Sequence, residues 1–176
     1  MKKIFVFLLL IIAVMCFQAQ PVNSYQLPRW QFFPIKVYIE EHPKKQIVRN
    51  AFDEWEARTH MAKFFYVDSD RKIPKIIVRF AENSSGTDHS NAVGVTYSFT
   101  PYGFYATANV VMYTNHPGTN IPLTDKEIHS VALHEIGHAL GLKHVPDKND
   151  IMYFQMNRTE HLTPNDLNQF FSIYKL

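Results

Sequence analysis

The chain has 176 residues, with 18 Lys and Arg against 16 Asp and Glu, and a single cysteine. This length is enough for one domain with one hydrophobic core, and one cysteine excludes an internal disulfide. The near balance of charge gives no reason to expect nucleic acid or an anionic membrane as a partner.

The N-terminus has the pattern of a secretory signal peptide. Lys2 and Lys3 precede an uninterrupted apolar stretch, residues 4–17, and small and polar residues follow it. At 14 residues this stretch is short for a membrane span. We therefore predict a signal peptide over residues 1–24, with cleavage after Ser24.

The predicted signal leaves one exported domain, residues 25–176. Cleavage after Ala19 and an uncleaved anchor are the alternatives to cleavage after Ser24. The only cysteine, Cys16, lies in the signal, so the domain has no thiol nucleophile and no cysteine-based latency switch. Loss of two lysines with the signal balances the remaining basic and acidic residues. We expect a secreted monomer, extracellular or periplasmic, without stable membrane association.

The first part of the domain combines strands with one helix. Apolar and polar residues alternate over residues 35–39, as in a half-buried strand. Apolar residues then occur at helical spacing, which is typical of the core-facing side of a helix: Val48, Ala51, Phe52 and Trp55. Four more segments are predicted as strands: 64–67, 76–80, 93–99 and 106–114.

A second helix is predicted from Asp125 to Leu140. Thr124 and Glu127 form a T-x-x-E capping box at its start. Apolar residues at helical spacing give it one buried side: Ile128, Val131, Ala132, Ile136, Ala139 and Leu140. Gly141 follows, and glycine ends helices because it enters the left-handed conformation without strain.

The end of this helix belongs to an H-E-x-x-H-x-x-G-x-x-H motif. His134 and His138, four positions apart, project from one face and can reach one ion. The turn at Gly141 lets His144 return to that ion, whereas a continuous helix would carry it ~15 Å from His134. Three imidazoles suit zinc and leave a fourth position for water. Glu135 lies beside the ion, where we expect it to act as the general base.

Two features follow the motif. Met152 lies in a short loop eight residues after His144. Thr163 and Pro164 have the pattern of a helix start, and apolar residues follow at helical spacing over residues 167–174. Strands, the motif helix, a loop with methionine and a closing helix predict an α+β domain.

The zinc motif with a methionine turn downstream resembles the metzincin clan of zinc endopeptidases. The short spacing and the Met-Tyr pair at Met152 look most like the matrixins, the matrix metalloproteinase family, over residues 30–174. The resemblance implies a twisted mixed sheet of about five strands with three helices. It also implies one catalytic zinc, a supporting role for Gly141 and Met152, and an edge strand at residues 93–99 that holds substrate extended.

The sequence departs from the family pattern in three ways. Val145 follows the third histidine where vertebrate matrixins usually have Ser or Thr, and Phe154 stands where those enzymes usually have proline. The Pro-Arg-Cys-Gly latency motif and haemopexin-like repeats do not occur, so we expect a minimal catalytic domain. By the resemblance, Phe154 and Met156 form an apolar wall of the pocket for the residue on the carboxyl side of the cut.

Further metal sites are not expected. Asp88 and His89 lie where matrixins often hold a structural zinc, but the family's full ligand set is absent there. Asp68 and Asp70 suit a polar turn and need no calcium to explain them. The other histidines lie outside any motif and are expected to be solvated: His42, His60, His116, His129 and His161.

These features predict a secreted zinc metalloendopeptidase that acts on proteins or peptides. Two alternatives stay open. One is a zinc hydrolase of short cell-wall peptides or another non-protein substrate, which would use the same chemistry. The other is an exported binding module without turnover; such modules usually lack the base or a ligand, and here Glu135 and all three histidines are present.

Overall fold

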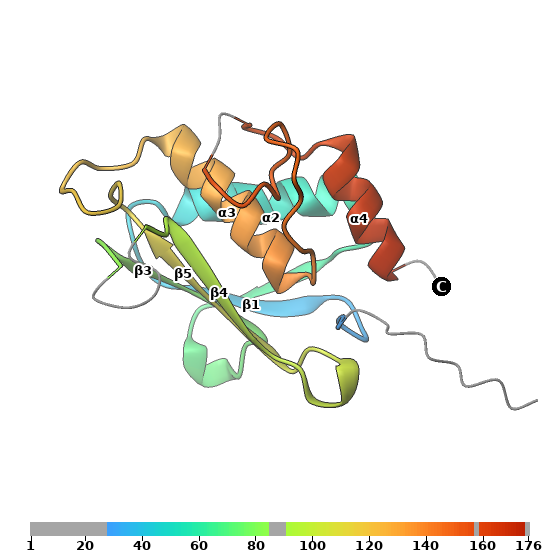
Figure 1. Ribbon diagram of the computed structural model, residues 1–176. Coiled ribbons are helices and arrows are strands. Elements are labelled where there is room, and N and C mark those ends of the chain that lie inside the picture. The colour runs from blue at the N-terminus through green and yellow to red at the C-terminus, as the bar shows by residue number, and fades with distance from the viewer. Residues whose placement is uncertain (1–27, 85–90, 157–158, 175–176) are drawn as a thin grey trace, which may run out of the picture.

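A computed structural model describes residues 28–84, 91–156 and 159–174 (Figure 1). The predicted signal peptide lies outside the described residues, as do Asp88 and His89. Among the described residues, no helix has both the length and the apolar character that crossing a membrane requires.

The domain is built on one five-stranded sheet. Its strands are β1 (Ile35–Ile39), β2 (Phe64–Val67), β3 (Ile76–Ala81), β4 (Gly94–Phe99) and β5 (Thr107–Tyr113), in the order β2-β1-β3-β5-β4. The first four strands in this order pair in parallel, whereas β4 pairs antiparallel with β5. β4 lies at the end of this order and is therefore an edge strand.

Within the described part of the chain, the α-helices lie on one face of the sheet (Figure 1). They are α2 (Lys45–Thr59), α3 (Asp125–Ala139) and α4 (Pro164–Tyr174), and two short 3₁₀ helices lie at Asp70–Lys72 and Pro101–Gly103. A mixed sheet covered by separate helices confirms the predicted α+β fold. The Thr124–Glu127 capping box also forms as predicted, with both reciprocal hydrogen bonds present.

The core lies between the sheet and the helices. The predicted apolar side of α2 is buried, and the Trp55 side chain is 0% exposed. Its indole Nε1 donates a hydrogen bond of 3.0 Å to the carbonyl oxygen of Leu133 on α3. α2 therefore fixes the position of α3 by packing and by a directed bond.

The C-terminal end of α3 is held by both ends of the described chain. The last carbonyl groups of a helix have no partner within it. Trp30 Nε1 donates to the carbonyl oxygen of Ala139 at 2.8 Å, and the Tyr174 hydroxyl donates to that of Leu140 at 2.9 Å. The point at which the chain leaves α3 is thereby fixed.

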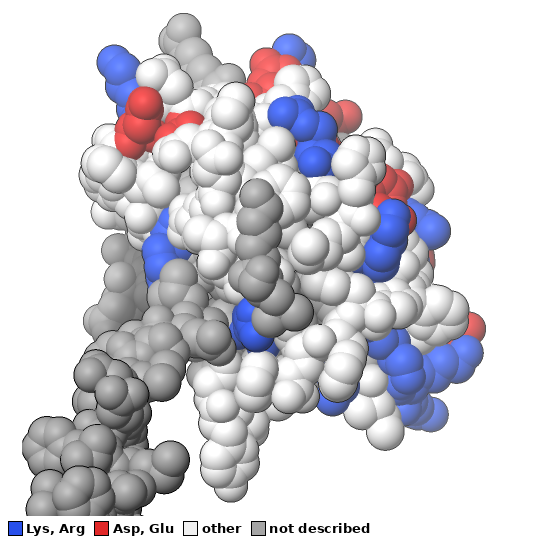
Figure 2. All heavy atoms as spheres, turned by 90° about the vertical axis from the view of Figure 1, so that its right-hand side faces the viewer, with Lys and Arg blue, Asp and Glu red and all other residues white. Residues whose placement is uncertain are grey.

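On the face seen in Figure 2, acidic and basic side chains lie side by side in the upper half, and basic side chains gather at the lower right. Much of that face carries neither kind of charge.

Candidate metal centre and substrate cleft

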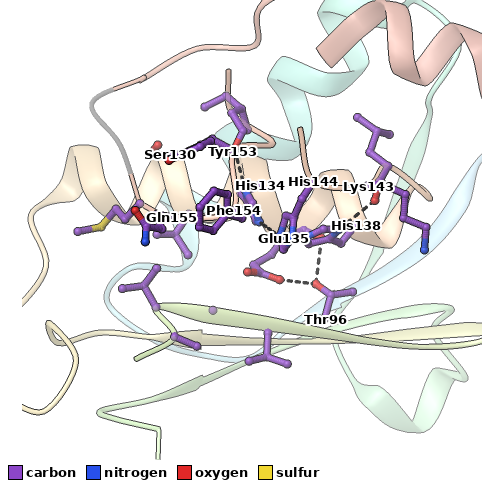
Figure 3. A pocket seen from close by; sticks show the side chains of 18 of the residues that line it. Thr96, Ser130, His134, Glu135, His138, Lys143, His144, Tyr153, Phe154 and Gln155 are labelled. Carbon is purple, nitrogen blue, oxygen red and sulfur yellow. Dashed lines mark hydrogen bonds between the residues drawn. The ribbon is translucent and has the colours of Figure 1, made fainter. Parts of the chain in front are cut away.

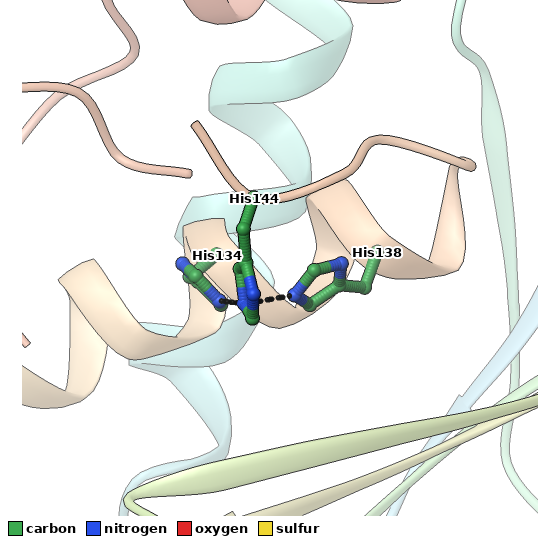
Figure 4. A group of neighbouring side chains, drawn as sticks. All are labelled: His134, His138 and His144. Atoms are coloured by element: carbon green, nitrogen blue, oxygen red, sulfur yellow. Dashed lines mark hydrogen bonds between the residues drawn. The ribbon is translucent and has the colours of Figure 1, made fainter. Parts of the chain in front are cut away.

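Three histidines from α3 and the following loop meet at one point. The chain turns at Gly141, where φ is 103° and a Cβ would lie 2.7 Å from the carbonyl oxygen of Pro28. Only glycine fits this turn without strain. It brings Nε2 of His144 to 3.2 Å from Nε2 of His134 and 3.0 Å from Nε2 of His138 (Figure 4).

The hydrogen bonds of these rings leave lone pairs at the meeting point. Nδ1 of His134 lies 2.7 Å from the carbonyl oxygen of Ile151, and Nδ1 of His138 lies 2.9 Å from that of Leu142. A carbonyl oxygen only accepts, so both Nδ1 atoms carry the proton and both Nε2 atoms are acceptors. Of the three Nε2 atoms that meet, only that of His144 can carry a hydrogen. The arrangement therefore fits a cation better than a hydrogen-bonded cluster.

Distances and protonation both suit zinc. A tetrahedral ion with Zn–N distances of about 2.0–2.1 Å holds its ligand nitrogens about 3.3 Å apart. Burial lowers the pKa of His138 to about 3 and also lowers the pKa values of His134 and His144. The rings are thus neutral near pH 7, which is the form that binds metal.

Glu135 lies beside the histidines and is 4% exposed. The Thr96 hydroxyl on β4 lies 2.7 Å from Glu135 Oε2, to which it donates, and 3.0 Å from the Glu135 carbonyl oxygen (Figure 3). Desolvation raises the pKa of Glu135 to about 7, and the hydrogen bond from Thr96 opposes that rise. A carboxyl group with a pKa near the working pH can both accept and donate a proton.

Sequence reasoning did not identify Thr96 as a site residue. Alternation along β4 places Gly94, Thr96 and Ser98 on one face, but no local signal tells that this face meets α3. Gly94 makes the approach possible, because a Cβ there would lie 2.7 Å from Cγ of Glu135.

Met152 lies directly against α3 and is 0% exposed. A Cβ at Gly137 would overlap Met152 Sδ, so this glycine, at an unspecified position of the motif, leaves room for the methionine. The Val145 amide donates to the Met152 carbonyl oxygen at 2.9 Å, which ties the loop of His144 to the methionine turn.

A buried carboxylate on α4 holds the methionine turn. Asp166 is 0% exposed, and its two oxygens accept the amides of Ile151 and Met152, each at 3.1 Å. It also accepts the Thr163 amide at 2.9 Å, while Thr163 Oγ1 accepts the Asp166 amide at 3.3 Å. The T-x-x-D spacing could have revealed this capping box. It could not have revealed the contact with the methionine turn.

A cleft of about 790 Å³ runs between β4 and α3. The three histidines, Glu135 and residues of β4 line it, and so do Phe154 and Met156, the predicted wall residues. These two side chains are 56% and 40% exposed. The edge of β4 that does not pair with β5 has no strand partner among the described residues, and β4 borders the cleft.

The carboxylates considered for calcium face basic side chains. Asp68 lies 2.9 Å from Lys72 Nζ, and Asp70 lies 3.0 Å from Arg79 Nη2. Ser69 Oγ accepts the Arg71 amide at 3.2 Å and so caps the first 3₁₀ helix. The segment has the polar turn that its sequence predicts.

Comparison with known proteins agrees with this geometry. The sequence model of the matrixin family matches residues 26–175. Metalloendoproteinase 1 of Glycine max is 25% identical over 164 residues, which cover 84% of this chain and 53% of that protein. The chain thus spans about half the length of this curated relative.

Proposed function

Because this chain belongs to the matrixin family, we propose that it is a zinc-dependent metalloendopeptidase that hydrolyses peptide bonds in proteins. The observation that carries the proposal is the convergence of three neutral imidazoles beside the buried carboxyl group of Glu135. A metal ligand set and a proton acceptor lie together in a cleft that borders an edge strand. This combination supports hydrolysis of an extended chain.

His134, His138 and His144 would hold the zinc. A zinc ion bound there would lower the pKa of a coordinated water from about 15.7 to about 7 and would polarise the carbonyl of the bond to be cut. Met152 and Asp166 act on this site indirectly. They fix the turn whose Ile151 carbonyl oxygen orients the ring of His134.

Glu135 transfers the proton. Its carboxylate accepts a proton from the attacking water and then gives that proton to the departing amine. The hydroxyl of Thr96 donates a hydrogen bond to Glu135 Oε2, so Glu135 Oε1 is the oxygen that carries the proton. Burial keeps water from competing for the same carboxylate and places its pKa where both transfers proceed.

The edge of β4 would bind the substrate backbone. A peptide that pairs with an edge strand is held extended and is recognised largely independently of its sequence. Phe154 and Met156 would then form the wall of the pocket for the residue on the carboxyl side of the cut. An apolar wall favours Leu, Ile, Met or Phe at that position.

We also propose that the domain spans residues 25–176, acts as a monomer and is exported by a signal peptide at residues 1–24. The two alternative functions differ in what they require. A hydrolase of short cell-wall peptides would use the same groups, so only its substrates distinguish it. A binding module has no need of a buried, correctly placed Glu135, and the assembled site therefore favours an enzyme.

Cleavage mapping tests the function. Purified protein would be incubated with intact proteins and with a proteome-derived peptide library, with and without phenanthroline, and cut sites would be read by mass spectrometry. We expect internal cuts in proteins that the chelator abolishes. Undiminished cleavage after verified metal removal would overturn the metalloenzyme, and cuts confined to short cell-wall peptides would favour the alternative hydrolase.

A further inference from the structure

A second cluster of potential metal ligands lies outside the cleft. Glu54 on α2, His129 on α3 and His161 in the segment before α4 bring their ligand atoms within 4.8 Å of one another. The prediction that His129 is solvated is wrong: its side chain is 19% exposed and that of Glu54 is 16% exposed. The His161 side chain remains 74% exposed.

Two ligand distances of this cluster are close to those between the three histidines of the cleft, whereas the His129 and His161 rings lie farther apart, with centroids 6.3 Å from each other. Glu54 Oε2 lies 3.2 Å from His129 Nε2 and 3.2 Å from His161 Nδ1. The three histidines of the cleft approach one another at 3.0 and 3.2 Å. Both sets are close to the ligand spacing of about 3.3 Å that a tetrahedral zinc ion imposes.

The cluster is built on fixed elements. Glu54 precedes Trp55, whose indole joins α2 to α3. The other oxygen of the same carboxylate, Glu54 Oε1, accepts the Leu162 amide at 2.8 Å. A backbone donor on one oxygen orients the carboxylate and leaves Oε2 to point at both imidazoles, as the partners of metal ligands commonly do. Ser130 Oγ donates to the Thr159 carbonyl oxygen at 2.6 Å, which holds the neighbouring segment on α3.

We propose that Glu54, His129 and His161 form a second divalent metal site, which binds zinc. Two imidazoles and one carboxylate suit zinc and similar transition metals, whereas calcium and magnesium take oxygen ligands. The bound ion would join α2, α3 and the segment before α4. In the sequence, His161 follows the methionine turn and the wall residues of the cleft. The ion would therefore hold the part of the chain that comes after them.

Metal analysis in paired variants tests the site independently of peptidase activity. The full chain would be equilibrated with zinc, freed of unbound metal by gel filtration and analysed for zinc per chain. We expect two zinc ions in the wild type and one in His161→Ala. In a His134→Ala/His138→Ala background we expect one, and none when His161→Ala is added. His60→Asn is the matched control, because His60 is an exposed histidine with a φ of 55° that asparagine tolerates.

Two further measurements cover a variant that fails to fold. Glu54→Gln keeps an oxygen for the Leu162 amide but removes the charge, and should also lower the count by one. Zinc should raise the Tm of the His134→Ala/His138→Ala protein, and His161→Ala should abolish that rise. A single zinc in the wild type, or a count that His161→Ala and Glu54→Gln leave unchanged, would overturn the second site and show that the two histidines only donate hydrogen bonds to Glu54.

Discussion

At the scale of single residues, the proposed mechanism assigns proton transfer to Glu135 and metal binding to the three histidines. The carboxylate lies beside the three ligand nitrogens and is held by Thr96. We therefore predict that Glu135→Ala keeps the fold and the zinc of the cleft while turnover falls about 10²- to 10⁴-fold, the usual contribution of a positioned general base. Peptide hydrolysis and metal analysis on one preparation would check this. Near-full activity in the variant would show that another group takes the proton.

The hydroxyl of Thr96 gives a second prediction at this scale. Thr96→Val keeps the shape of the side chain but removes the donor to Glu135 Oε2. A hydrogen bond of this kind contributes about 1 kcal/mol, so we expect kcat to fall about fivefold to tenfold with little change in KM. Because that bond lowers the pKa of Glu135, the acidic limb of the pH–kcat profile should move to higher pH. Thr96→Ser should behave like the wild type, and an unmoved limb in Thr96→Val would contradict the role.

Met156 tests the wall of the pocket. Each buried methylene contributes about 0.8 kcal/mol, so Leu, Ile, Met or Phe after the cut should be preferred over Ala by several-fold to a hundredfold. Methionine is flexible, so several apolar shapes should be accepted. Met156→Arg should weaken this preference in cleavage maps. A profile that stays unchanged would mean that other residues form the wall.

At the scale of elements, α4 holds the methionine turn through Asp166. An asparagine has one acceptor oxygen in place of two, so Asp166→Asn leaves at least one buried amide of Ile151 or Met152 without a partner. Each such group costs about 1–3 kcal/mol. We predict a loss of that size in the free energy of unfolding, measured with urea, together with weaker zinc binding. Ser172→Ala, an exposed change on the same helix, should cost under about 0.5 kcal/mol.

Elements with local signals could be predicted from the sequence, whereas contacts between elements could not. The Thr124–Glu127 box predicts the start of α3, and Gly141 predicts its end. The spacing of the three histidines relative to this helix predicts that they meet. The antiparallel placement of β4 depends on how the whole sheet assembles. Contacts such as Thr96 with Glu135, or Glu54 with His129, join segments far apart in the chain, and no local pattern encodes them.

At the scale of the whole molecule, acid should destabilise the metal-free protein. Burial lowers the pKa values of the three histidines of the cleft below 6.5, so the unfolded chain takes up protons before the folded one does as pH falls. The folded state then loses stability. Glu135 acts in the opposite direction, because its pKa of about 7 lets the folded state take up a proton first.

Between about pH 6.5 and about pH 4.5 the effect of His138 offsets that of Glu135, and the lowered pKa values of His134 and His144 then make the free energy of unfolding fall as pH falls. Urea unfolding in the presence of a chelator would measure it. Glu135→Gln removes the opposing group and should steepen the fall. Glu54 and Glu127, whose pKa values are lowered, lose their contribution only below this window. A free energy that stays constant or rises as pH falls would contradict the assignment.

The hydrogen bonds from two indole groups to α3 also make intrinsic tryptophan fluorescence a probe of this helix. Trp30 and Trp55 are the only tryptophans of the chain, and both donate to carbonyl groups of the helix that carries His134 and His138. Fluorescence excited selectively in tryptophan therefore arises entirely from probes attached to that helix. Zinc uptake or peptide docking that shifts α3 changes the surroundings of both indoles, and can be followed in real time without a label.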